Sequence, residues 1–177
     1  MANRKYFGTG VAIGILITAI AVMSAILIIV YTGSYNISAR EDHSSFGRWA
    51  LSTSMVASVQ RRADQKPPEF TNSMIAAGAH EYQSMCEHCH GGPGIERAIW
   101  AEGMAPQPPH LTEAAAHWSP AEVFWLVSHG VKMSGMPAFG ATHNEKTLWN
   151  ITAFVKQLPA MTPAQYQELG DQKNDDH

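Results

Sequence analysis

The hydrophobic positions at the start of the chain form one uninterrupted block. Between Phe7 and Tyr31 there is no charged residue, and as a helix this run measures about 37 Å, longer than the roughly 30 Å hydrocarbon core of a bilayer. A cleaved signal peptide is the alternative, with Arg4 and Lys5 as its basic start. Signal peptides have shorter apolar regions and end at a small-residue cleavage site, which this run lacks. The pattern therefore favours a retained membrane-spanning helix.

A second hydrophobic pattern follows in a more polar stretch. Within residues 45–62, apolar side chains recur at near-helical spacing, at Phe46, Trp49, Ala50, Val56 and Val59. Pro67 and Pro68 end this pattern because proline cannot continue a helix. The spacing predicts an amphipathic helix. The sequence leaves open whether this helix lies on the membrane or a partner subunit, or packs against its own domain.

The remaining chain predicts an all-α domain built from short helices. The apolar periodicity and the breakers place helices at about residues 72–86, 119–130, 142–158 and 162–170. The second of these begins with Ser119, Pro120 and Glu122, a capping box with proline at the first helical position. No convincing strand pattern appears, and Asp171 to His177 are expected to be disordered.

Three consecutive parts result from these patterns. Residues 1–31 are expected to form the N-terminus and transmembrane anchor, residues 32–70 a connector, and residues 71–177 a compact domain; that the N-terminus is cytoplasmic is implied only by the family resemblance given below. From residue 72 on, acidic side chains outnumber basic ones by eleven to five, whereas the whole chain carries a net charge of −3. An acidic domain is steered towards a basic docking face on another protein, and nucleic acid is not an expected partner.

The only two cysteines, Cys86 and Cys89, lie in the sequence Cys-Glu-His-Cys-His, which ends at His90. Two thiols three positions apart can each form a thioether with one haem, and the following histidine can bind the iron. A thioredoxin-like pair would need a βαβ setting, and structural zinc usually takes a second ligand pair of matching spacing. Covalent haem attachment explains this spacing best. The glycines that follow at positions 91, 92 and 94 are expected to let the backbone pass close to the flat macrocycle, because they have no side chain.

An iron held by His90 on one face needs a second axial ligand. Met136 is the preferred candidate because Pro137 follows it and glycines flank the loop, so that the chain can turn tightly over the haem. Met133 ranks next and Met104 well behind. The other histidines considered are expected to lie on helices or on the surface, namely His110, His117, His129 and His143.

These motifs resemble class I c-type cytochromes over residues 75–158. The first helix and haem-binding motif of that family match at Gly78, Tyr82, Cys86, Cys89, His90 and Gly91. The Met136-Pro137 pair is similar to the family's sixth-ligand loop, and Phe154 to the aromatic residue that packs on the first helix. The resemblance also implies that the carbonyl of Pro109 accepts a hydrogen bond from His90. His110 departs from the family, which often has Asn or Asp there.

The whole chain resembles bacterial membrane-anchored monohaem cytochromes. This resemblance implies one covalent haem c, with His90 and Met136 on the iron and the domain on the periplasmic side of the inner membrane. It implies electron transfer rather than catalysis, as a tethered carrier or as a subunit of an oxidoreductase complex. The expected partners are a membrane oxidase, a quinol-oxidising complex or a dehydrogenase of a respiratory chain. A catalytic or gas-sensing haem is the alternative, and it would require a displaceable Met136.

Overall fold

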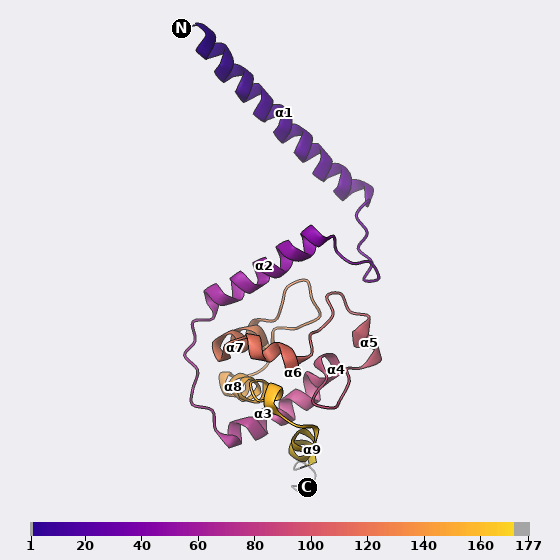
Figure 1. Ribbon diagram of the computed structural model, residues 1–177, viewed down its shortest axis with the longest axis vertical. Coiled ribbons are helices and arrows are strands. Elements are labelled where there is room, and N and C mark those ends of the chain that lie inside the picture. Colours follow the sequence, from indigo (N-terminus) through magenta and orange to yellow (C-terminus); the bar gives the residue numbers. More distant parts are fainter. Residues whose placement is uncertain (1, 172–177) are drawn as a thin grey trace. The chain divides into compact units, whose positions relative to one another are not determined.

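The protein is helical throughout the part of the chain that its computed structural model describes, residues 2–171. Within these residues there is no strand, and only one isolated bridge pairs Gly92 with Ile95. The expected all-α class is therefore confirmed. The chain divides into two compact units after Glu41 (Figure 1). The predicted disorder began at Asp171, but this residue still belongs to a helix, and residues 172–177 lie outside the described residues.

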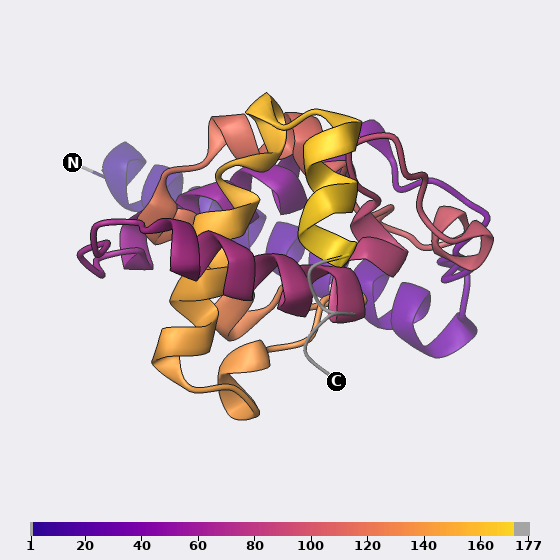
Figure 2. The same ribbon diagram turned by 90° about the horizontal axis from the view of Figure 1, so that it is seen from below.

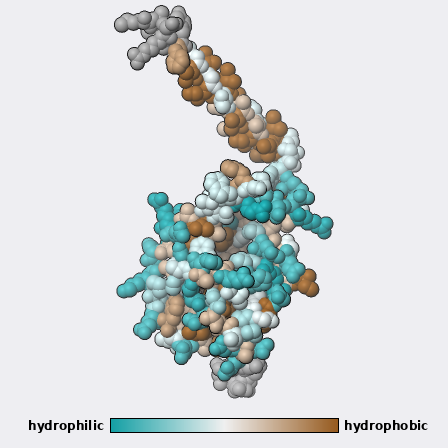
Figure 3. Space-filling model, viewed as in Figure 1, coloured by the Kyte–Doolittle hydropathy of each residue, from teal (hydrophilic) through white to brown (hydrophobic). Residues whose placement is uncertain are grey.

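The smaller unit contains one long helix, α1 (Ala2–Thr32). Its segment Phe7–Thr32 has a mean hydropathy of 2.9 and is exposed along its whole length, so it is not a core helix of the larger unit. Figure 3 shows apolar residues along α1, whereas polar residues dominate the visible face of the larger unit. A helix that is apolar on all sides and is not buried in protein suits a lipid environment. The chain thus has one N-terminal transmembrane helix.

The larger unit begins with α2 (Ser45–Arg62), at the residues that the sequence pattern predicted. Ser44 caps it by accepting a hydrogen bond from the backbone N–H of Gly47 at 3.1 Å. In its second half Val59 is buried, with 1% of its surface exposed, and α2 packs against α7 (Pro120–His129). The sequence left open whether this helix lies on the membrane or a partner subunit, or packs against its own domain. Its second half packs against its own domain. The predicted connector 32–70 is divided accordingly, because α2 belongs to the larger unit.

The centre of the larger unit is the crossing of α3 (Asn72–Met85) with α8 (Glu145–Val155). At Gly78 an added Cβ would lie 2.0 Å from the carbonyl oxygen of Asn150, so the close approach of these helices requires a glycine. One turn later, the rings of Tyr82 and Phe154 pack with their centroids 5.2 Å apart, and both are fully buried. This is the packing that the family resemblance implied for the first and last helices.

The predicted capping box at the start of α7 is confirmed. The Ser119 hydroxyl accepts from the N–H of Glu122, whose carboxylate accepts in return from the N–H of Ser119. At the other end Gly130 adopts a positive φ of 64°. A Cβ there would lie 2.6 Å from the backbone of Pro137, so the glycine lets the loop of residues 131–138 fold back over the end of α7.

Helix α8 is shorter than the sequence pattern predicted. It begins after the capping residue Asn144 and ends at Val155, and Leu158 lies buried in a separate 3-10 turn, η3 (Leu158–Ala160). Pro159 explains the difference, because a proline restricts the residue before it and lacks the N–H that would extend the helix. The final helix, α9 (Pro163–Asp171), packs beside α3, as Figure 2 shows.

Short elements complete the unit between α3 and α8. They are α4 (Glu87–His90), α5 (Ile99–Glu102), α6 (Leu111–Ala114), η1 (Ala115–His117) and η2 (Phe139–Ala141). Together with the loops around them, these elements surround a cavity beside the α3–α8 crossing.

Candidate cofactor site

The cavity measures about 310 Å³ and its lining is overwhelmingly apolar. It lies between the end of α3, the α4 turn, the segment 104–115 and the loop that follows α7. Aliphatic side chains from α7 and α8 form part of its wall, including Val123, Leu126, Val127, Ile151 and Val155. A site with this lining keeps water away from a bound group and leaves few polar atoms to orient it.

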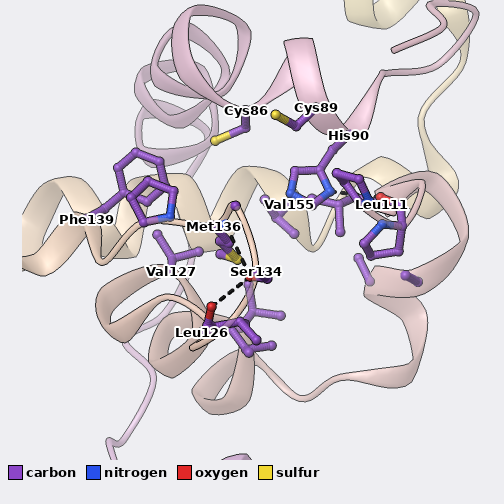
Figure 4. Close-up of a pocket in the computed structure, with 18 of the residues that line it drawn as sticks. Cys86, Cys89, His90, Leu111, Leu126, Val127, Ser134, Met136, Phe139 and Val155 are labelled. Carbon is purple, nitrogen blue, oxygen red and sulfur yellow. Dashed lines mark hydrogen bonds between the residues drawn. The ribbon is translucent and has the colours of Figure 1, made fainter. Parts of the chain in front are cut away.

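Both cysteines and His90 reach this cavity from a single turn. Helix α3 ends at Met85, and the carbonyl of Cys86 then accepts hydrogen bonds from the N–H groups of Cys89 and His90, at 3.1 and 2.9 Å. This tight turn places both sulfur atoms and the imidazole at the same cavity (Figure 4). Neither cysteine forms a disulfide. The two thiols are therefore positioned to react with one ligand rather than with each other.

Burial, together with the nearby Cys89 and Glu81, raises the pKa of the Cys86 thiol to about 12. The thiol is thus protonated at neutral pH.

Among residues 2–171, no group of three or more histidine, cysteine, aspartate or glutamate side chains is placed to hold a metal ion. His88 does not line the cavity, so the structure does not bring it to the thiols as a further ligand.

The imidazole of His90 is oriented by a backbone carbonyl. Its Nδ1 lies 2.8 Å from the carbonyl oxygen of Pro109, the contact that the family resemblance implied. Burial lowers the pKa of His90, the Pro109 hydrogen bond opposes this, and Arg97 and His110 lower it slightly further. A neutral ring that donates from Nδ1 keeps the lone pair of Nε2 available for a metal ion.

Arg97 binds the segment that contains Pro109. It is 9% exposed, and its guanidinium donates a hydrogen bond at 2.5 Å to the carbonyl of Pro108, the residue next to Pro109. The sequence reasoning missed this contact, because nothing in the pattern around Arg97 distinguishes it from a surface arginine. Through this bond Arg97 fixes the position of the carbonyl that orients His90.

Met136 faces the cavity from the loop after α7. Its N–H donates to the Ser134 hydroxyl, which in turn donates to the carbonyl of Val131, at 3.2 and 2.7 Å (Figure 4). These bonds tighten the loop so that Met136 lines the cavity. Met133 instead points to solvent, with 79% of its surface exposed and a positive φ of 62°.

Met104 also lines the cavity, although the sequence argument ranked it behind Met133. Its side chain packs against Gly135, where an added Cβ would lie 2.0 Å from the Met104 methyl carbon. As candidate ligands, Met104 therefore ranks ahead of Met133 in the structure, whereas the sequence argument ranked them in the opposite order. Sequence spacing did not reveal this, because Met104 approaches the cavity from a different segment of the chain.

The glycines after His90 have a different structural role from the one the sequence suggested. Gly91, Gly92 and Gly94 were expected to let the backbone pass close to the haem, but none of them lines the cavity. A Cβ on Gly92 would lie 2.7 Å from the ring of Tyr166, and one on Gly94 would lie 3.0 Å from Pro163. The missing side chains at these two positions therefore make room for α9.

The other candidate histidines do not line the cavity. His129 stacks on Trp125 with ring centroids 4.6 Å apart, and Nδ1 of His143 lies 2.8 Å from the Thr142 hydroxyl. His110 and His117 do not line the cavity either. One tryptophan does: Trp118, whose carbonyl accepts a hydrogen bond from the Lys156 ammonium.

Three further supports of the site come from outside the Cys-Glu-His-Cys-His turn. Met55, on α2, lines the cavity, and the pattern of apolar positions in α2 did not single it out. The Tyr166 hydroxyl donates a hydrogen bond to the carboxylate of Glu87, within the Cys-Glu-His-Cys-His turn, at 2.5 Å. The Tyr82 hydroxyl donates to the carbonyl of Gly91 at 2.7 Å. The turn that carries the cysteines is thus held on both sides.

The residues at this cavity fit a haem c. Two thiols on one turn, an imidazole with a free Nε2 and a thioether side chain are the donors that covalent haem attachment and axial ligation use. The apolar walls match a flat hydrophobic macrocycle.

A comparison with known families gives a match over the segment that contains most of these residues. Residues 73–155 match the family model described as cytochrome C oxidase, cbb3-type, subunit III. The match spans α3 to α8, and so includes the cysteine turn, the Pro109 segment and the Met136 loop. It ends before α9 and begins after α2. No curated protein matches the chain.

Proposed function

Residues 73–155 form a c-type cytochrome domain carried behind an N-terminal transmembrane helix, and we propose that this protein transfers single electrons at the outer surface of its membrane. The observation that carries the proposal is the donor set around one apolar cavity: Cys86, Cys89, His90 and Met136. If His90 and Met136 both hold the iron, it would have no vacant position for a substrate. Electron transfer is then the chemistry that this site supports best.

The chain's own residues each have a task in this proposal. Cys86 and Cys89 would hold the haem through two thioethers, in which each sulfur would be bonded to one vinyl carbon and its hydrogen to the neighbouring carbon. His90 offers Nε2 to the iron while Pro109 holds its Nδ1–H. When bound, the haem supplies a one-electron iron couple. The Met136 thioether favours the reduced iron, and the apolar walls restrict water.

Location and partners follow from the same reasoning. Covalent haem attachment takes place outside the cytoplasm in the family that the sequence resembles, so the cytochrome domain is assigned to the periplasmic face of a bacterial inner membrane. Its net charge of −6 from residue 72 on favours a basic docking surface on the partner. The matching family's description names an oxidase subunit. We therefore favour a membrane-bound terminal oxidase as the electron acceptor.

Haem attachment tests the proposal directly. In a host that matures c-type cytochromes, the wild-type chain should carry one covalent haem, measured by its pyridine haemochrome spectrum and by the mass of the intact protein. Cys86→Ala and Cys89→Ala should each leave at most one thioether, which shifts the haemochrome band. Because the cavity adjoins the core, the haem-free chain should be poorly folded. A well-folded, haem-free Cys86→Ala protein would count against the proposal.

A further inference from the structure

Two aromatic side chains stand on the surface at the start of α2. Phe46 is 74% exposed and Trp49 is 60% exposed, and their ring centroids lie 5.7 Å apart. Residues three positions apart lie on the same side of a helix, so the two rings form one continuous apolar face. Paired large aromatics that stay uncovered by their own domain are typical of a contact surface.

The aromatic face is fixed to the cytochrome domain by the rest of its helix. Val59 is buried against the domain, and Met55 lines the haem cavity. The Ser44 cap begins the helix directly before Phe46, so the face sits on a regular helical turn. Whatever covers Phe46 and Trp49 therefore also sets the orientation of the cavity.

The membrane is always within reach of this face. Residues 33–44 join α1 to α2, and a fully extended chain from Thr32 to Ser45 spans at most about 45 Å. A tether this short keeps the face at a millimolar-scale effective concentration near the bilayer, so that a weak contact is populated. A second copy or a separate partner has no such advantage.

The chemistry of the face also suits lipid. Tryptophan and other aromatics collect at the interface between hydrocarbon and headgroups, where an apolar ring and a polar edge are both accommodated. Arg48, which lies between the two aromatics in the sequence, has a side chain that is 64% exposed and an ion pair to Asp42 at 3.8 Å. A long basic side chain beside an inserted ring can remain among the headgroups while its stem contacts lipid.

We propose that Phe46 and Trp49 insert into the lipid interface of the membrane that α1 spans, and dock the cytochrome domain on the bilayer surface in one orientation. The occupant of this face is the bilayer itself. The proposal rests on the membrane-spanning role of α1 and not on the redox function of the haem. Because the same helix contributes Met55 to the cavity, docking presents one side of the haem site to partners at the membrane surface.

A spin label next to the face tests the docking in the full-length haem-loaded protein. Thr53 is exposed one turn beyond Trp49, and Glu168, on α9, is an exposed control position. Thr53→Cys and Glu168→Cys are each labelled, since the native cysteines are consumed by haem attachment, and are reconstituted in phosphatidylcholine vesicles. The measurement is the accessibility of the label to oxygen, which partitions into lipid, against a water-soluble nickel chelate.

We expect the Thr53 label to be shielded from nickel and accessible to oxygen, and the Glu168 label to remain water-exposed. Adding Phe46→Ser and Trp49→Ser should return the Thr53 label to the values of the control. Both aromatics are exposed, so these substitutions should leave the haem spectrum unchanged. High salt should not release the Thr53 label, because apolar insertion is not screened.

Several results would overturn the proposal. The Thr53 label could stay water-exposed in vesicles, or its shielding could survive the double serine variant. Shielding that appears only in native membranes would assign the face to a partner protein. Shielding that disappears when the protein is diluted in lipid would assign the aromatic face to a second copy. Loss of the shielding in high salt would assign the contact to the charge of Arg48. Each of these results is independent of whether the haem transfers electrons.

Discussion

The proposed choice of axial ligand depends on single residues in the loop after α7. Met133 and Met136 are three positions apart in sequence, but Met136 lines the cavity and Met133 faces solvent. Replacing Met136 by Ala should open the sixth position, remove the iron–sulfur absorption band, lower the midpoint potential and let cyanide or carbon monoxide bind. These properties are measured by spectroscopy with each ligand and by a redox titration.

Met133→Ala is the matched control for this prediction and should leave the spectrum and potential close to wild type. Met104→Ala should preserve the iron–sulfur band while loosening the packing against Gly135. If Met104→Ala removes the band and Met136→Ala retains it, the ligand assignment passes to Met104. Cyanide binding by the wild-type protein without loss of structure would instead favour a catalytic or gas-sensing haem.

The second prediction at the residue scale concerns Arg97. Its buried guanidinium donates to the carbonyl of Pro108 and so holds the segment that orients His90. Removing a hydrogen bond to a charged group costs roughly 1.5–3 kcal/mol of unfolding free energy. Arg97→Ala should lose about this amount in a denaturant titration that follows the haem band, and the NMR signals of His90 should shift. Arg97→Lys keeps a donor and should recover part of the loss, whereas a purely space-filling role would predict no such recovery.

At the scale of elements, α9 supports the site although it lies outside the matched family segment. Its Tyr166 hydroxyl donates to the Glu87 carboxylate, and its ring occupies the space left by Gly92. Tyr166→Phe keeps the ring and removes the donor, so the unfolding free energy should fall by roughly 1.5–3 kcal/mol. Thermal or denaturant unfolding measures the change, with the exposed Glu168→Ala as the control in the same helix. An unchanged stability would show that Glu87 finds an equivalent partner in water.

The helices of this domain were largely predictable from sequence because their signals are local. The capping box at Ser119, the glycine at 130 and the apolar periodicity of α2 and α3 each determine structure within a few residues. The predicted end of α8 was three residues too late. The apolar periodicity continues through Leu158, directly before Pro159, but the helix already ends at Val155.

The candidate site was predictable where it depends on spacing and not where it depends on packing. Cys86, Cys89 and His90 belong to one turn, so their motif contains the geometry. Met55, Met104 and Arg97 reach the site from distant segments, and only the fold brings them there. The glycines at 92 and 94 were assigned to the wrong neighbour for the same reason, since Tyr166 and Pro163 approach them from α9.

At the scale of the whole molecule, the boundary between anchor and domain lies before α2. Supplying a cleavable signal and deleting residues 1–41 should therefore yield a soluble, red protein with α2 still packed on α7. Deleting residues 1–70 should also remove Val59 and Met55, expose apolar surface beside the cavity and lower the stability. Fully burying a residue such as Val59 contributes roughly 1.5–3 kcal/mol, so the longer deletion should lose at least this much. Equal stability of the two truncated proteins would make α2 dispensable for the domain.

The anchor itself leads to the last prediction. An apolar helix of this length holds its protein in the bilayer by burial that salt does not screen, so the full-length protein should remain with membranes through high-salt and carbonate washing. Intact mass of the purified protein should include residues 1–31. The protein lacking residues 1–41 should accept electrons but react more slowly with a membrane-bound partner, because the tether no longer raises its local concentration. A mature N-terminus beyond Tyr31 would identify the helix as a signal peptide. It would leave the haem-site proposal unaffected, because the residues that line the cavity all belong to the larger unit.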